Sequence, residues 1–131
     1  MPRNSSLIPR LASIGVLFSM LACDAEEALP GPGTMLATLV SPVEGGEGGA
    51  VIELFGDGVL SIEGVGPTEV FSRLNQGGAR VALISQEGDQ LMFLIELADT
   101  LQLPSVVIEE VAGPDDQLRA DLGKYKIEFE R

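Results

Sequence analysis

Carboxylates are the side chains of this chain that are best suited to acid–base chemistry. Its 131 residues include 20 Asp and Glu, 8 Lys and Arg, one Cys and no His. Without histidine, a Ser-His-Asp triad, a Cys-His dyad and a histidine-ligated zinc ion are excluded. Carboxylates and hydroxyls remain, with Arg73, Arg80 and Arg119 as the basic residues in the middle of the chain. Carboxylate-dependent hydrolysis and calcium binding are therefore the chemistries to consider.

Paired carboxylates hydrolyse glycosides when they lie about 5 to 9 Å apart beside a sugar-binding cleft. Because neighbouring residues of a strand point to opposite faces, we expect Glu109 and Glu110 not to share a site. The chain has no Trp and one Tyr to stack against a sugar ring. We therefore expect solvated acids and no catalytic residue, and a small carboxylate-dependent, glycosidase-like hydrolase is the alternative. The acids considered are Glu109-Glu110, Asp115-Asp116 and the isolated Glu53, Glu63 and Glu96.

Two acidic loops are candidates for calcium, which needs only hard oxygen ligands. Asp57 stands between two glycines, and Asp115-Asp116 form an acidic pair. The D-x-[DN]-x-[DN]-G pattern is absent, and turn chemistry alone accounts for Asp beside Gly. Residues 44–49 are rich in glycine but contain two acids and no Lys, so they suit a flexible hairpin or inter-strand loop better than a phosphate site. We expect no metal or cofactor, with calcium at the acidic loops left open.

The first 23 residues follow the order of an export signal. Arg3 and Arg10 supply positive charge, residues 11–22 form an apolar run, and Cys23 is the only thiol. A membrane span needs about 20 apolar residues, so this run is too short for one and suits the core of a signal peptide. An internal Pro and Gly, and the lack of a polar stripe, disfavour a buried N-terminal helix. We expect residues 1–22 to be a signal peptide.

The segment Met20-Leu21-Ala22-Cys23 resembles the lipobox of bacterial lipoproteins. In that motif small residues precede a cysteine that is acylated through its sulfur and becomes the mature N-terminus. Ala22 agrees with the motif, whereas Met20 and Leu21 depart from its aliphatic-then-small pair. The resemblance implies a lipid such as palmitate on Cys23, which would anchor the protein to a membrane of the bacterial cell envelope. Ordinary signal cleavage after Ala25 is the alternative.

An acidic tether and a single domain are expected after the signal. Residues 23–33 hold the lipidated cysteine and a stretch rich in acids, Pro and Gly that should be solvated. Residues 34–131 are enough for one hydrophobic core. Without residues 1–22 the chain keeps 6 basic and 20 acidic residues, a net charge of −14. Because nucleic-acid affinity depends on Lys and Arg, we expect no nucleic-acid partner and interpret the acids as a solvated surface.

Short apolar runs alternate with Gly, Pro and Asp clusters in the expected domain, as in strands and turns. Residues 91–97 are almost continuously apolar and should form a central strand covered on both faces. Tyr125, Ile127 and Phe129 should share one face of the last strand. The pattern predicts an all-β fold, an antiparallel β-sandwich of jelly-roll or immunoglobulin-like type with about eight strands. The expected strands are residues 35–40, 50–55, 59–65, 69–75, 79–85, 91–97, 105–111 and 125–130.

Only residues 115–122 have helical features. An acidic N-cap precedes Leu118 and Leu122, which are four residues apart, and Gly123 follows where a helix would end. A short strand after an acidic turn fits a sandwich equally well, so both alternatives stay open.

The layout of residues 49–97, with strands, glycine turns and a long apolar strand, resembles the β-sandwich of cohesin-type modules. Cohesins bind a protein partner through a sheet face, so the resemblance implies an interaction role. We expect an exported, lipid-anchored, non-catalytic module that binds an envelope protein or acts as a structural accessory. An exposed apolar sheet face or an open edge strand would favour this module, whereas a cleft with converging acids would favour the hydrolase.

Overall fold

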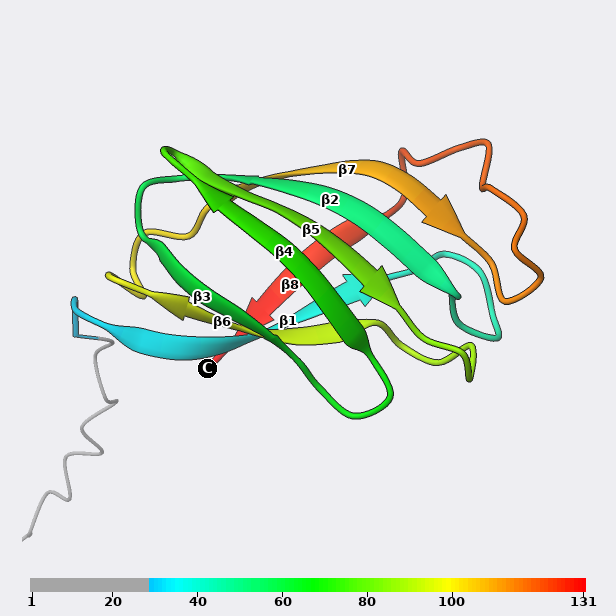
Figure 1. The fold of residues 1–131 in the computed structure, drawn as a ribbon, viewed down its shortest axis with the longest axis horizontal. Helices are drawn as coiled ribbons and strands as arrows, with labels where there is room; N and C mark the ends of the chain where they lie inside the picture. The colour runs from blue at the N-terminus through cyan, green and yellow to red at the C-terminus, as the bar shows by residue number, and fades with distance from the viewer. Residues whose placement is uncertain (1–28) are drawn as a thin grey trace, which may run out of the picture.

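The structure is a computed structural model that describes residues 29–131. This part of the chain forms eight strands and no helix (Figure 1). It therefore contains no helix with the length and apolarity needed to cross a bilayer. All eight predicted strands are confirmed, with ends that differ by at most two residues. The strands are β1 (Gly33–Val40), β2 (Gly49–Phe55), β3 (Val59–Gly64), β4 (Glu69–Asn75), β5 (Gly78–Ile84), β6 (Met92–Leu97), β7 (Ser105–Ala112) and β8 (Lys126–Glu130).

The strands form two four-stranded sheets that lie face to face (Figure 1). Sheet A has the order β3-β6-β1-β8, and sheet B has the order β4-β5-β2-β7. All neighbouring strands are antiparallel. Every connection except the β4–β5 hairpin passes from one sheet to the other, so crossing loops make up both ends of the fold. The prediction of an all-β, antiparallel β-sandwich is confirmed.

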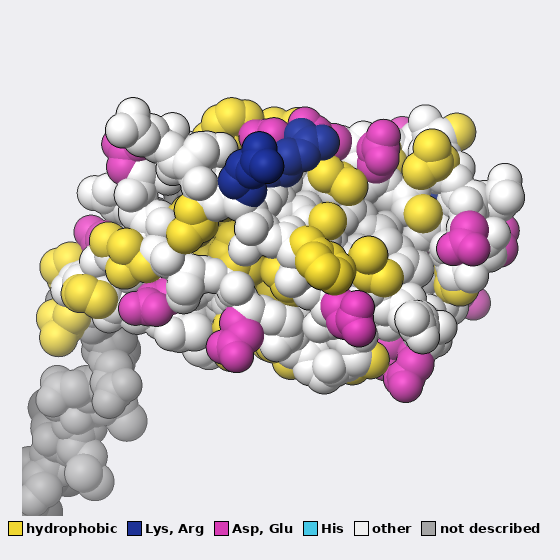
Figure 2. All heavy atoms as spheres, viewed as in Figure 1, with side chains coloured by type: hydrophobic (Ala, Val, Ile, Leu, Met, Phe, Trp, Pro, Cys, Tyr) yellow, Lys and Arg dark blue, Asp and Glu magenta, His cyan; other side chains and the backbone are white. Residues whose placement is uncertain are grey.

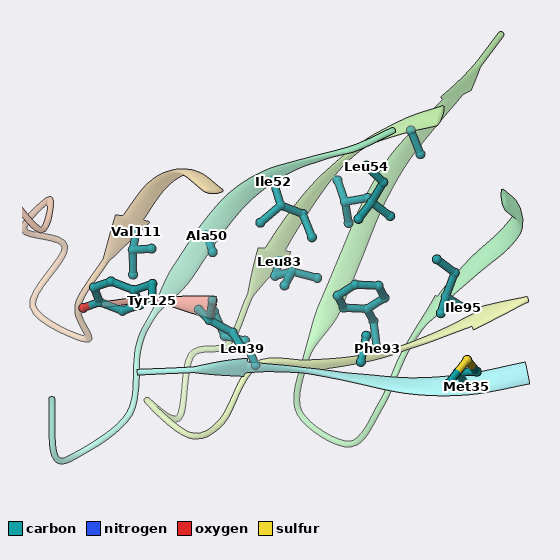
Figure 3. Packing of buried hydrophobic residues seen from close by; sticks show 14 of the residues in the cluster. Met35, Leu39, Ala50, Ile52, Leu54, Leu83, Phe93, Ile95, Val111 and Tyr125 are labelled. Carbon is teal, nitrogen blue, oxygen red and sulfur yellow. The ribbon is translucent and has the colours of Figure 1, made fainter. Parts of the chain in front are cut away.

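The core lies between the sheets because alternate side chains of each strand point to the same face. In β2, Ala50, Ile52 and Leu54 are buried, while the residues between them point outward. Figure 3 shows Ile52 of sheet B and Leu39 and Phe93 of sheet A pointing into the space between the layers. Burial of such a side chain stabilises the fold by about 1.5–3 kcal/mol.

Strand β6 is central, as predicted, with β3 and β1 on either side. Phe93 and Ile95 face the core and are fully buried. The prediction that both faces of this strand are covered is wrong, because Met92 and Leu94 on the outer face are only partly buried. No second layer covers this face within residues 29–131, and cross-strand neighbours such as Leu36, which lies opposite Leu94, provide the shielding there.

The connection between β7 and β8 is a loop, so the helical alternative for residues 115–122 is wrong. The strand alternative reduces to an isolated bridge between Ala112 and Leu118. The Gln117 N–H donates to Asp115 Oδ1 at 3.2 Å, and Asp116 has a φ of 63°. A left-handed residue interrupts a right-handed helix, and aspartate adopts this conformation more readily than most residues.

Strand β1 begins at Gly33, a residue that we expected in the tether. The preceding residues are already bonded to the β6–β7 connection: the Thr100 N–H donates to the Gly31 carbonyl oxygen at 3.0 Å, and the Gly31 N–H donates to Asp99 Oδ1 at 3.3 Å. Gly31 is flanked by prolines, which have no N–H to donate. Its own backbone therefore attaches this stretch to the fold.

Candidate functional site

The residues connected with export lie outside the described part of the chain. Cys23, the expected lipidation site, and residues 1–22, the expected signal peptide, both precede residue 29. Acylation, cleavage after Ala25 and the acidic first part of the tether stay predictions.

Glu47 is the one buried carboxylate among residues 29–131, with a residue exposure of 2%. Its Oε1 accepts hydrogen bonds from the Tyr125 hydroxyl at 2.7 Å and from Ser41 Oγ at 2.6 Å. Its Oε2 accepts a hydrogen bond from Arg119 Nε at 3.0 Å, which is also a salt bridge. We call these four residues the Glu47 cluster. Both carboxylate oxygens are occupied by the protein itself.

The Glu47 cluster holds together loops that are far apart in the sequence. Glu47 belongs to the β1–β2 loop, while Arg119 and Tyr125 belong to the β7–β8 loop. Backbone bonds reinforce the contact: the Gly48 N–H donates to the Ala112 carbonyl oxygen, and the Arg119 N–H donates to the Val111 carbonyl oxygen, both at 2.8 Å. The cluster therefore closes one end of the sandwich.

The hydrogen bonds of the cluster shift two pKa values. Burial raises the pKa of Tyr125 above its usual value, and the bond to Glu47 raises it further because a phenolate would lie against a carboxylate. The bond to Glu47 is also the main reason why the pKa of Arg119 is raised. Both shifts favour the protonated donors at neutral pH. The cluster is thus a satisfied structural network and no acid–base site.

No motif in the sequence points to this cluster. Residues 44–49 were expected to be a flexible hairpin or inter-strand loop, and the flexible hairpin is wrong because the segment crosses between the sheets and buries Glu47. Gly46 has a φ of 75°, and a Cβ there would collide with the Gly88 carbonyl oxygen. Two partners of Glu47, Arg119 and Tyr125, are more than 70 residues away from it in the sequence. Only Ser41 is a near neighbour.

The acidic loops considered for calcium bring no ligand set together. In residues 29–131 no three Asp or Glu side chains are grouped closely enough to hold a metal ion. Asp115 and Asp121 instead accept hydrogen bonds from backbone N–H groups two residues further on, at 3.2 and 2.9 Å. These are the local bonds through which aspartate forms turns.

Arginine and glutamate side chains form a charged row across the outer face of sheet B. Arg80 Nη1 lies 2.8 Å from Glu53 Oε1 and 2.7 Å from Glu109 Oε2. The bond to Glu53 and the charge of Glu109 raise the pKa of Arg80. Arg73 lies opposite Arg80 in the β4–β5 register. Glu53 has no acidic neighbour in the sequence, but in the fold it shares a guanidinium with Glu109.

A β-bulge in β7 explains why Glu109 reaches this row. Val51 lies opposite Glu110, whereas the next residue, Ile52, lies opposite Ile108. Glu109 is the extra residue, and both it and Glu110 are exposed. The prediction that these two acids point to opposite faces is wrong, because a bulge interrupts the alternation of side chains.

Apolar side chains surround the charged row. Val51, Phe71 and Ala82 line a shallow depression of about 340 Å³ together with Arg73 and Arg80. A second hollow of about 200 Å³ adjoins it on the same face, where Ile84 and Leu118 are exposed. Figure 2 shows the Lys and Arg side chains of this view gathered beside acids, with hydrophobic side chains on the surface below them. We call Val51, Phe71, Arg73, Arg80, Ala82 and Ile84 the sheet B patch.

Comparisons of the chain with protein-family models, with curated proteins and with solved structures gave no match. The fold and the surface chemistry therefore define the protein only as an acidic antiparallel β-sandwich with an arginine-containing apolar face. The likeness to cohesin-type modules stays an expectation from the sequence.

The Glu47→Ala variant should be markedly less stable than the wild-type protein. The substitution leaves the buried hydroxyl of Tyr125 without its acceptor and removes the salt bridge of Arg119, which should cost about 3 kcal/mol of unfolding free energy. Glu44→Ala, in the same loop but exposed, is the matched control and should change it by less than about 0.5 kcal/mol. Urea unfolding measures both values. Equal midpoints for the two variants would contradict a stabilising role for the cluster.

Tyr125 should ionise at higher pH in the folded protein than in the unfolded chain. Its pKa is raised in the fold, whereas the unfolded value is about 10, so the stability from its neutral hydroxyl is present below pH about 10 and is lost as pH rises through the folded pKa. Tyr125 is the only tyrosine and the chain has no Trp, so phenolate absorbance reports this group alone. Coincident titration curves with and without urea would show that the hydroxyl is not buried against Glu47.

Proposed function

We propose that the protein is an exported, lipid-anchored component of the bacterial cell envelope whose β-sandwich is a non-catalytic module that binds another protein. The first 23 residues support the location, because their charge, apolar run and cysteine follow the order of a lipoprotein signal. The observation that carries the binding role is the sheet B patch, in which Phe71 is 60% exposed beside Arg73.

The composition of the patch suits a protein partner. Aromatic residues and arginine are enriched at the centres of protein–protein interfaces, where they supply most of the binding energy. Arg80 is fixed by two carboxylates, and Arg73 takes part in no salt bridge within residues 29–131. Arg73 is therefore available for a carboxylate or a carbonyl group of the partner. A partner surface with apolar side chains around an acidic residue would complement the patch.

Carbohydrate is a poorer fit than protein for this face. Sugar rings stack on flat aromatic side chains, most often Trp and Tyr. The chain has no Trp, its one Tyr is buried in the core, and Phe71 is the single aromatic ring of the sheet B patch. Glu53 and Glu109 approach one guanidinium on an open surface, where Arg80 offsets part of their negative charge. This arrangement supports a binding role over glycoside hydrolysis, which needs one acid that stays protonated in a cleft.

Substitution of Phe71 should abolish capture of a partner. Phe71→Ser removes the most exposed aromatic side chain of the patch without touching the core. The immobilised protein should retain a protein from envelope extract at high salt, and the variant should lose it, because apolar contacts are not screened by salt.

Leu60→Ser is the matched control, because Leu60 is similarly exposed but belongs to a strand of sheet A. Leu60→Ser should retain the partner. Arg73→Glu should bind the partner more weakly, and the loss should be larger at low salt, because the new carboxylate then faces the acidic residue of the partner. Equal capture by Phe71→Ser and Leu60→Ser would refute the patch. Turnover of a model glycoside or ester that is lost in the Glu53→Gln variant would contradict the non-catalytic module and support the hydrolase.

The Cys23→Ser variant should be released from the membrane. A serine hydroxyl does not accept the thioether-linked lipid, and without acyl chains the strongly acidic protein has no affinity for anionic membrane surfaces. Membrane fractionation, with labelling by a radioactive fatty acid, compares the variant with the wild type. Membrane retention of Cys23→Ser would count against the lipid anchor.

A further inference from the structure

The sandwich is open on the side where β7 and β8 are edge strands. Strand β7 pairs only with β2, and β8 pairs only with β1. Between them lies a groove of about 420 Å³ lined by apolar side chains from both sheets, among them Val106 and Ile108 of β7 and Ile127 and Phe129 of β8. These four residues point inward but are only partly buried. An edge strand beside partly exposed core residues is a place where a further strand can add to a sheet.

The backbone of β8 offers hydrogen-bonding groups at this open edge. The Leu39 N–H donates to the Leu91 carbonyl oxygen at 2.9 Å, toward the β6 side of β1. Leu39 lies opposite Ile127 in the β1–β8 ladder. Because residues of an antiparallel strand bond alternately to the two sides, the N–H and C=O of Ile127 point away from β1. Ile127 is therefore ready to pair with a strand outside the fold.

The charges on β8 are arranged to match a second copy of the same strand. Along the outer face of β8, Lys126 precedes Glu128 and Glu130, and Ile127 lies between Lys126 and Glu128. An antiparallel copy centred on Ile127 places Lys126 opposite Glu128, and the two-fold axis repeats this pair on the other side of the centre. A centre at Glu128 keeps Lys126 opposite Glu130 but brings the two Glu128 carboxylates together at the axis, and a centre at Lys126 brings the two Lys126 ammonium groups together. Charged side chains usually keep edge strands apart, but here their order favours one self-pairing register.

We propose that two copies of this chain associate through antiparallel pairing of β8 with β8, about a two-fold axis at Ile127. The register that charge favours places Ile127, whose backbone faces the open edge, at the axis. Pairing joins the two A sheets into one eight-stranded sheet and makes an isologous interface. This proposal goes beyond the binding role of the sheet B patch, which lies on the other sheet.

The same pairing covers the open groove. Ile127 and Phe129 share the inward face of β8, so the equivalent side chains of the second copy lie on that face, beside the mouth of the groove. Lys126, which already lies 2.8 Å from Glu128 of its own strand, then stands between two glutamates. Apolar cover and paired charges together favour the dimer.

Charge reversal tests the register. Two differently tagged versions of the full chain are produced together in mild detergent, and retention of the second tag reports association. The wild-type protein should associate, more weakly as salt rises. When both copies carry Lys126→Glu, two glutamates lie opposite each other at each pair of positions 126 and 128. When both copies carry Glu128→Lys, two lysines lie opposite each other there. Each of these combinations should associate about tenfold more weakly than the wild type. Lys126→Glu mixed with Glu128→Lys restores opposite charges and should associate like the wild type.

Glu63→Lys, on the opposite edge strand of sheet A, is the control and should leave association unchanged. Cooperative thermal unfolding of each variant checks that it is folded. The proposal is overturned if the wild type does not associate, or if folded single reversals associate as well as the wild type, as clustering through lipids would produce. It is also overturned if the mixed pair fails to associate.

Discussion

The alternation of apolar and polar side chains along each strand is the constraint on which this fold depends. It gives each sheet one face that must be covered, and the two sheets cover each other through residues such as Ile52 and Phe93. The only cysteine, Cys23, precedes the described residues, so no disulfide supports the sandwich. Packing between the sheets, which is sensitive to the loss of a single methylene, therefore provides most of the stability.

The core is closed by buried polar contacts at one boundary and is partly exposed at another. At one end, Glu47 replaces apolar contact with a buried carboxylate whose partners Arg119 and Tyr125 come from another loop. Such a buried group is costly unless every bond is made, so it favours one arrangement of the loops over others. Along the β7–β8 side nothing of this kind exists among residues 29–131, and Ile127 and Phe129 stay partly exposed. The first boundary suits a fixed structure, and the second suits association.

The strands were predictable because their signal is local. Period-two alternation and Gly or Pro turns located all eight of them, including the inward face of β8 with Ile127 and Phe129. The Glu47 cluster and the sheet B patch could not be predicted in this way, because they depend on contacts between distant residues or on single irregular residues. A bulge at Glu109 reverses the direction of one side chain, and a left-handed Asp116 ends an otherwise helical pattern. Neither Glu47 nor the sheet B patch has a motif, since both arise from strand order.

Strand β1 brings the chain into the fold at the middle of sheet A, with β6 on one side and β8 on the other. A strand at an edge can be peeled from a single neighbour, but a central strand must break two ladders and uncover core side chains such as Met35 and Ala37. Mechanical tension applied through the residues before Gly33 therefore acts on a firmly held element. A domain attached in this way would resist being pulled apart while it is tethered at one point and gripped at another.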